Sequence, residues 1–352
     1  MKSTRATFLR DLEAGPLLDA FLLTAVVSVL GIRVWLHLSG YPKLGGDSLH
    51  IAHMLWGGLL MLAALVLLLG FLDRPARRLA VVLGGVGFGT FIDEVGKFIT
   101  HDNDYFYRPA VSVMYVVFLL LYLAGRYLTR RGSATGSEYV VNALREVGEI
   151  AVGDLDPRER DRAIGYLEAS GDDGPLVRDL RRILAEAELV AAPLPGRLQR
   201  AGSALVDGYR RLASQTWFGW ALILFFTVKL VGMALRLTVA ADWLAPETAS
   251  LPAIPLVNPL PADLEDFALA HWLQLGGSLV SGAFVALGVV RVFGDRLAAL
   301  RSFQASVIAS LCLNQVFVFY RVEWLGIGEL AFNLLVLAGL RFAIGRERRW
   351  SD

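Results

Sequence analysis

The sequence predicts an all-α membrane protein, a polytopic bundle of about eight transmembrane helices with a small helical insert on the cytoplasmic side. Two features of the composition predict this class. Hydrophobic residues make up 55% of the 352 residues, and mean hydropathy is +0.52, both high for a chain that folds in water. Charged residues make up only 19% and are clumped. The apolar stretches between them are roughly 20 residues long, enough to cross the hydrocarbon layer as helices.

The composition also excludes several functional classes. A net charge of +1 provides no basic surface for nucleic acid, so no nucleic-acid partner is expected. The single cysteine, Cys312, rules out a disulfide framework and a cysteine metal cluster within one chain. The partners that we expect are the lipid bilayer and a small ion or solute.

Each expected span is an apolar run, taken in chain order. The eight runs cover residues 17–38, 50–72, 79–100, 110–130, 217–239, 268–292, 298–320 and 327–345. The first run follows a mixed-charge segment and lacks a small-residue cleavage site. We therefore expect it to remain as a span and not to be removed as a signal peptide.

The distribution of arginine predicts the orientation. The short loops after the second, fourth and sixth spans and the end of the chain are rich in arginine, whereas the alternate loops are poor in basic residues. Because basic loops stay in the cytoplasm, both termini are predicted to be cytoplasmic, in a plasma-membrane protein. All five histidines then fall at extracytoplasmic ends of spans, namely His37, His50, His53, His101 and His271.

A polar segment divides the expected spans into two sets of four. The predicted domains are a first membrane half at 1–131, a helical cytoplasmic insert at 132–215 and a second membrane half at 216–352. In the insert, Asp156, Pro157 and Glu159 supply an N-cap, a first-turn proline and a capping partner, so a helix should begin there. Pro175 predicts a second helix start.

The end of the insert has two readings. From Leu194 to Leu212, leucines and arginines alternate at helical spacing, which is typical of a helix on the inner leaflet and also of a packed helix. The insert contains no phosphate-binding loop and no His/Cys cluster. Its expected role is regulation or binding of a partner, either a cytoplasmic protein or a second copy of the chain, through residues 132–215.

The two membrane halves share a polar signature that predicts a parallel internal repeat. A shift of 221 residues superposes His50 on His271, His53 on Gln274, Asp93 on Asn314 and Glu94 on Gln315. Under this repeat, the first half carries ionisable residues where the second mostly carries amides. We therefore expect function to be concentrated in the first half.

The main candidate site combines the second and third spans. His50 and His53 are three residues apart and share a helix face, and Asp93 and Glu94 lie near the outer end of the third span. Carboxylates at membrane depth are costly unless they pair, titrate or face the bundle interior, so they indicate a functional site. The structural alternative is an ion pair of Glu94 with Lys97 or with Arg33.

Imidazoles and carboxylates together suit two kinds of chemistry. They can hold a divalent metal such as Zn²⁺ or Mn²⁺, or they can form a proton-accepting chain near neutral pH. The candidate metal ligands are His50, His53, Asp93, Glu94 and His101. The residue pattern favours neither reading over the other.

The glycine run from Gly84 to Gly89 resembles a nucleotide-binding loop, but it lies inside the third span and no strand precedes it. Gly85 and Gly89 instead form a GxxxG pattern, which lets a neighbouring helix approach closely. We expect this contact to hold Asp93 and Glu94 against a neighbouring helix.

One segment resembles a known group of proteins. The run from Phe91 to Phe98, FIDEVGKF, followed by Asp102 to Phe106, DNDYF, is similar to a signature of uncharacterised bacterial multi-pass membrane proteins. The resemblance covers the second to fourth spans and implies no activity.

Three functions fit these features. The first is a transporter or channel-like protein that moves a proton, a divalent cation or a coupled solute through the histidine and carboxylate site. The second is a metal-dependent hydrolase embedded in the membrane and acting at the outer leaflet. The third is a membrane scaffold or sensor that signals through the insert.

Overall fold

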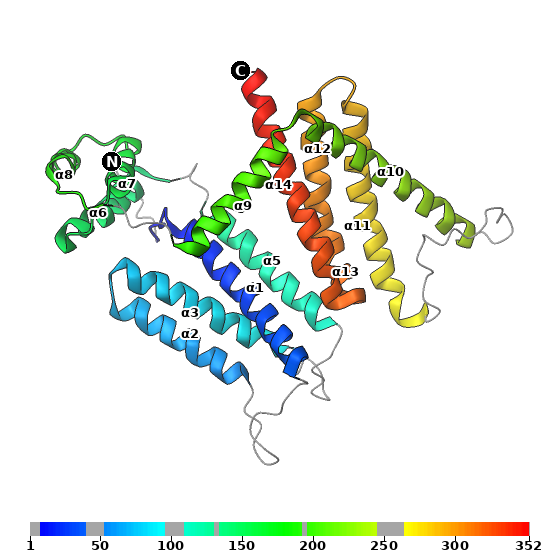
Figure 1. Cartoon of the computed structure of the whole chain (residues 1–352), viewed down its shortest axis with the longest axis horizontal. Helices are drawn as coiled ribbons and strands as arrows, with labels where there is room; N and C mark the ends of the chain where they lie inside the picture. Colours follow the sequence, from blue (N-terminus) through cyan, green and yellow to red (C-terminus); the bar gives the residue numbers. More distant parts are fainter. Residues whose placement is uncertain are drawn as a thin grey trace, which may run out of the picture. The chain divides into compact units, whose positions relative to one another are not determined.

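The computed structural model describes residues 8–39, 53–95, 109–129, 134–191, 196–244 and 264–351. In this part of the chain all regular structure is helical, which confirms the all-α prediction (Figure 1). The chain divides into two compact units. Unit 1 comprises Met1–Tyr105 and Val117–Pro195, and unit 2 comprises Phe106–Val116 and Gly196–Asp352.

The described residues contain several helices suited to a membrane. Five stretches are long and apolar enough to span it, or six if a bent pair formed by α9 and the start of α10 counts as one span. The five are Ala14–Ser39, His53–Gly70, Pro109–Leu128, Leu273–Arg291 and Arg296–Arg348. A multi-pass membrane protein is compatible with this finding, and the number of eight spans remains a prediction.

Unit 1 is built around helix α3 (Arg74–Asp93), which packs on both α1 (Ala14–Ser39) and α2 (His53–Gly70). Glycines bring the three helices together. A Cβ on Gly89 would lie 2.3 Å from the Ala25 carbonyl oxygen of α1, and a Cβ on Gly57 would lie 2.6 Å from the Gly87 carbonyl oxygen of α3. The predicted close approach at the GxxxG pattern is therefore confirmed.

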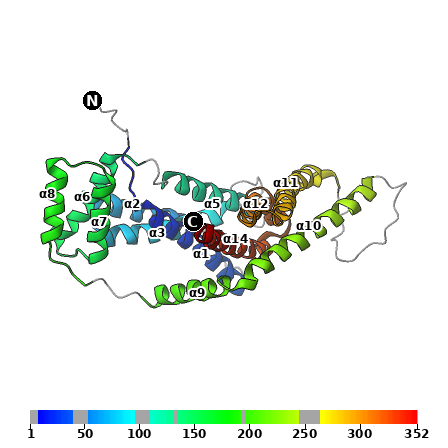
Figure 2. The ribbon, with the colours of Figure 1, turned by 90° about the horizontal axis from the view of Figure 1, so that it is seen from above.

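The insert forms a small helical layer within unit 1 (Figure 2). It consists of α6 (Gly136–Val152), α7 (Pro157–Ala169) and α8 (Pro175–Glu186). The predicted helix starts are confirmed, because Asp156 and Glu159 form a capping box at α7 and Pro175 opens α8. The apolar core of the insert includes Leu12, which precedes α1. The chain before α1 is thus part of the insert fold.

Unit 2 contains a second bundle of long helices. They are α9 (Arg197–Ala213), α10 (Thr216–Leu244), α11 (Leu264–Arg291), α12 (Arg296–Ala309), a π-helical turn at Ser310–Asn314, α13 (Gln315–Val322) and α14 (Gly326–Ser351). The first residues of α5 (Pro109–Leu128) also belong to this unit. A 3₁₀ turn begins at Glu323, whose φ of 48° is left-handed, and α14 then packs beside α12 (Figure 1). The apolar core centres on Phe226 and Phe303, whose rings stack 4.5 Å apart.

Candidate functional site

The C-terminal end of α3 places two carboxylates inside unit 1. Asp93 is the last residue of α3, and Glu94 is its C-cap. Only 1% of Asp93 and 0% of Glu94 is exposed. Because buried carboxylates are costly without partners, their contacts determine what this region can do.

Asp93 is paired with a cation from α1. The Nε of Arg33 donates to Oδ1 of Asp93 at 2.6 Å, and a second guanidinium nitrogen donates to the Asp93 carbonyl oxygen at 3.1 Å. The structure thus pairs Arg33 with Asp93, the residue next to Glu94, which the structural alternative had named as a partner of Lys97 or Arg33. The ion pair ties the end of α3 to α1.

His53, the first residue of α2, faces both carboxylates. Its Nε2 lies 3.2 Å from Oδ2 of Asp93, and its Nδ1 lies 3.7 Å from Oε1 of Glu94. A neutral imidazole carries one N–H and can donate to only one of the two carboxylates, whereas a protonated imidazole donates from both nitrogens. His53 therefore lies at hydrogen-bond distance from Asp93 and at ion-pair distance from Glu94.

Glu94 also caps a helix. Its Oε2 accepts a hydrogen bond of 2.8 Å from the backbone N–H of Met54, in the first turn of α2. A carboxylate at this position satisfies a backbone donor and interacts favourably with the positive end of the helix dipole. Glu94 thus holds the start of α2, and with it His53, against the end of α3.

We call Arg33, His53, Asp93 and Glu94 the His53 cluster. With a neutral imidazole its charges sum to −1, and with a protonated imidazole they sum to zero. The side chain of His53 is 24% exposed, compared with 14% for Arg33 and none for Asp93. Of the two basic side chains in the cluster, His53 is therefore the more exposed to solvent.

The other candidates in the first half lie outside the described residues. These are His50, His101 and Lys97. Within the described residues, no group of three or more His, Cys, Asp and Glu side chains is arranged to hold a metal ion. In the His53 cluster the two carboxylates contact Arg33, His53 and the Met54 amide.

The matching positions of the second half form an amide site in unit 2. Asn314 ends the π-helical turn, and Gln315 begins α13. Nε2 of Gln315 donates to the Gly326 carbonyl oxygen at 3.1 Å, and Asn333 lies 3.5 Å from Oε1 of Gln315. Gln274 is half-buried in α11, whereas the side chain of His271 lies outside the described set. These amides join helices within unit 2.

Sequence reasoning missed a second charged site, at the opposite end of α3. Arg74, in the first turn of α3, contacts three carboxylates of the insert. They are Glu146 and Glu149 of α6 and Glu159 of α7, and Arg74 also lies 3.8 Å from Glu13. We call this group the Arg74 clamp. Glu146 is 1% exposed and also pairs with Arg162 at 3.0 Å.

The segment before α1 extends the same contact. Asp11 pairs with Arg77 of α3 and with Arg145 of α6. Further along, Arg10 pairs with Glu138 of α6 at 3.0 Å, and Asn142 accepts from the Leu12 amide at 3.0 Å. The sequence contains an indication of this site, because Glu146 and Glu149 share a helix face and could bind one cation. The arginines between the second and third expected spans were used in the sequence analysis only to predict orientation.

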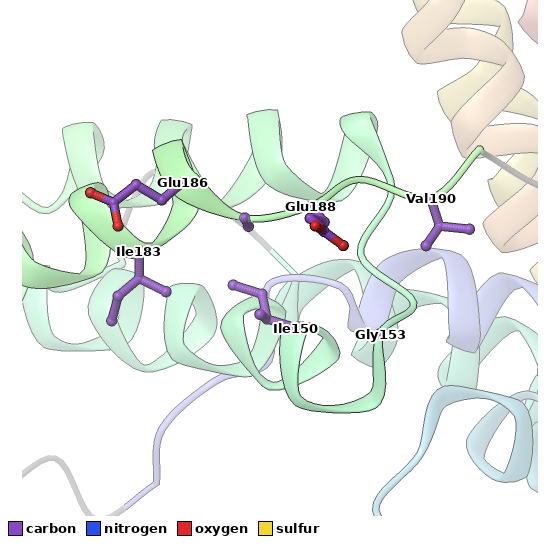
Figure 3. A pocket seen from close by; sticks show the side chains of 7 residues that line it. Ile150, Gly153, Ile183, Glu186, Glu188 and Val190 are labelled. Carbon is purple, nitrogen blue, oxygen red and sulfur yellow. The ribbon is translucent and has the colours of Figure 1, made fainter.

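The insert also carries an open groove of about 470 Å³. Residues from the ends of α6 and α8 line it, and the labelled side chains include Ile150, Ile183, Glu186 and Glu188 (Figure 3). No member of the His53 cluster lines this groove.

Comparison with known proteins identifies no relative of this chain: no family model, no curated protein and no solved structure matches it. Its function is therefore inferred from the two charged sites that α3 connects.

Proposed function

We propose that this protein is a proton-responsive membrane sensor that reports the charge of His53 to the helical insert through α3. The observation that carries the proposal is that α3 contributes to both charged sites. Asp93 at one end belongs to the His53 cluster, and Arg74 at the other end belongs to the Arg74 clamp. At 1.5 Å per residue the two ends are about 29 Å apart, close to the thickness of the hydrocarbon layer.

The glycine packing supports transmission along α3. Where backbones touch, small movements are not absorbed by side-chain rearrangement, because packed interfaces shift between discrete arrangements. A protonated His53 would attract both carboxylates, whereas a neutral imidazole carries one N–H and can donate to only one of them. The resulting change in the position of α3 would reach Arg74, which contacts the insert, and Arg77, which pairs with Asp11.

The proposal includes a topology. We propose eight spans in two parallel sets of four, with α3 as the third span, both termini in the cytoplasm and the His53 cluster on the outer side of the plasma membrane. One similarity between the halves is offset by one residue from the shift of 221, because Asp73 and Asp295 are 222 residues apart. Asp73 caps α3 by accepting from the Ala76 amide, and Asp295 caps α12 by accepting from the Ala298 amide. An arginine follows each of these aspartates.

The proposal is tested by measuring the insert as the pH changes. Spin labels at Leu72→Cys, in the loop before α3, and Leu176→Cys, on α8, would be placed in a Cys312→Ser chain in lipid nanodiscs. We expect the distance distribution between the labels to change between about pH 5 and pH 8, where histidine changes charge. The change should disappear in His53→Gln.

His37→Gln is the matched control, because His37 is an exposed histidine at the same end of α1 as Arg33. This variant should respond to pH like the wild type. A pH response that persists in His53→Gln, or the lack of any response in the wild type, would contradict the proposal.

Proton-coupled transport is a second candidate, favoured by the burial of Asp93 and Glu94 together with Arg33. Buried ionisable groups of this kind mark ion pathways in membrane proteins. Transport predicts proton or cation flux into proteoliposomes that is lost in Asp93→Asn and in Glu94→Gln. The sensor proposal predicts no flux above that of empty liposomes.

A further inference from the structure

Helix α9 has an apolar face that unit 2 covers only in part. Towards the C-terminal end of α9, the Tyr209 hydroxyl donates to the Leu335 carbonyl oxygen at 2.7 Å, and Ala213 is buried. Further towards the N-terminus, 76% of Leu205 and 50% of Val206 remain exposed. The N-terminal half of the helix thus presents aliphatic side chains that α14 does not cover.

The other face of α9 is basic. At 100° per residue, Arg200 and Arg210 lie about 140° from Leu205 and Arg211 lies about 120° from it. They share this side with a single acid, Asp207, which lies 3.7 Å from Arg210. The fourth arginine of the helix, Arg197, is its first residue. An apolar face backed by arginines is the composition of a helix that lies in a membrane interface and binds anionic headgroups.

The junction of α9 with α10 has the features of a membrane edge. The described parts of the two helices meet at an angle of 81° (Figure 1). Just beyond the bend, Trp217 and Trp220 are 53% and 60% exposed. The guanidinium of Arg296 lies 5.4 Å from the centre of the Trp220 ring, and Arg346 donates to the Ser214 carbonyl oxygen at 3.0 Å. Exposed tryptophans beside arginines are typical of the headgroup level.

From these contacts we infer that α9 is an interfacial anchor that inserts Leu205 and Val206 among acyl chains and binds anionic phospholipid headgroups through its arginines. The occupant of the exposed apolar face is therefore lipid and not another protein surface. The sequence from Leu194 to Leu212 is compatible with a helix on the inner leaflet or with a packed helix, and the inference selects the helix on the inner leaflet. The inference is independent of the charge of His53.

The test uses the full chain with Cys312→Ser, carrying a single spin label at Leu205→Cys or at Arg200→Cys. Collision rates with oxygen, which dissolves in hydrocarbon, and with a water-soluble nickel complex report what surrounds each label. Nanodiscs of phosphatidylcholine alone are compared with nanodiscs that also contain phosphatidylglycerol. A label at Val152→Cys, an apolar residue that is 74% exposed on the insert, is the matched control.

The label at Leu205 should collide more often with oxygen than with the nickel complex. The labels at Arg200 and Val152 should collide more often with the nickel complex. In nanodiscs with phosphatidylglycerol, the ratio of oxygen to nickel collision rates at Leu205 should be roughly five-fold higher than in phosphatidylcholine alone. This is the factor that corresponds to about 1 kcal/mol, the attraction of one arginine to an anionic membrane surface. Replacing all four arginines with glutamine should abolish that lipid dependence.

Three results would overturn the inference. A Leu205 label as accessible to nickel as the Val152 label would place α9 in water. A label shielded from both reagents would mean that protein covers the face. Equal behaviour in the two lipid mixtures would exclude recognition of anionic headgroups.

Discussion

His53 and Glu138 belong to two separate charged sites of unit 1. In the His53 cluster an imidazole lies between two carboxylates. In the insert, hydrogen bonds from Arg10 lower the pKa of Glu138 from 4.5 to about 2. The contact between the N-terminal segment and the insert is therefore unaffected in the range where His53 is expected to act.

The first prediction concerns Glu138. A carboxyl whose pKa is lower in the folded state stabilises the fold above its unfolded pKa, and this stability is lost as the pH falls through the folded value. Docking of residues 8–13 on α6 should thus be constant above about pH 5 and weaken between about pH 4.5 and 2. Glu138→Gln should lose the part of this acid dependence that comes from the Arg10 pair, as followed by proteolysis of the N-terminal segment. The part that comes from Asp11, whose pKa is also lowered, should remain.

Glu168→Gln, which changes an exposed carboxyl of α7, is the control and should keep the acid dependence of the wild type. If Glu138→Gln and the wild type weaken over the same acid range, the Arg10 pair does not hold the segment.

At the level of single residues, the sequence predicted that His53, Asp93 and Glu94 meet, but not how they pair. Neighbouring residues on a helix point about 100° apart, so the partner of Arg33 depends on the rotation of α3 about its axis. That rotation is fixed by the contacts of Gly85 and Gly89 with α1. These are tertiary contacts, which cannot be deduced from residue spacing alone.

Helix α3 depends on glycine at some positions and not at others, which gives the second prediction. A Cβ on Gly89 would lie 2.3 Å from a backbone oxygen of α1, whereas a Cβ on Gly84 would meet the Ala64 side chain at an ordinary 3.5 Å. Gly89→Ala should therefore destabilise the protein by roughly 1–3 kcal/mol, the cost of overpacking. Thermal unfolding in detergent would measure this loss.

Gly84→Ala is the matched control, since it adds the same methyl group to the same helix. It should leave the unfolding temperature unchanged or raise it, because alanine favours the helix over glycine. Equal losses in both variants would show that α1 and α3 do not touch at Gly89.

The Arg74 clamp supplies the third prediction. Arg74→Gln removes the cation that joins α3 to Glu146, Glu149 and Glu159 and leaves Glu146 with Arg162 as its cationic partner. We expect the insert to loosen from α3, with faster amide hydrogen exchange in α6 and α7. Arg78→Gln, at an exposed arginine in the next turn, should leave exchange unchanged.

Amide hydrogen exchange in α6 and α7 that is identical in Arg74→Gln and in the wild type would mean that the clamp does not hold the insert.

The helix starts in the insert could be predicted from the sequence because the signals for a helix start are local, as at Asp156 and Pro175. The clamp could not be predicted, because Arg74 and Glu146 are 72 residues apart and their contact depends on how the insert packs against α3.

Over the whole chain, composition predicted the all-α membrane class, and helix lengths support it. The docking of the N-terminal segment on the insert was not predicted, since Leu12 is a single apolar residue among charged neighbours. Its burial makes the insert part of unit 1 together with α1 and α3. A molecule organised in this way can pass a change from one end of α3 to the insert without a separate linker.

The most direct test fixes the charge of His53 and measures the insert. His53→Lys keeps a positive charge at all pH values of interest, and His53→Gln keeps a neutral side chain. With spin labels at Leu72→Cys and Leu176→Cys, we predict that the lysine variant shows the low-pH distance distribution of the wild type at every pH, and that the glutamine variant shows the high-pH distribution. If the two variants share one distribution, the charge of His53 does not reach the insert.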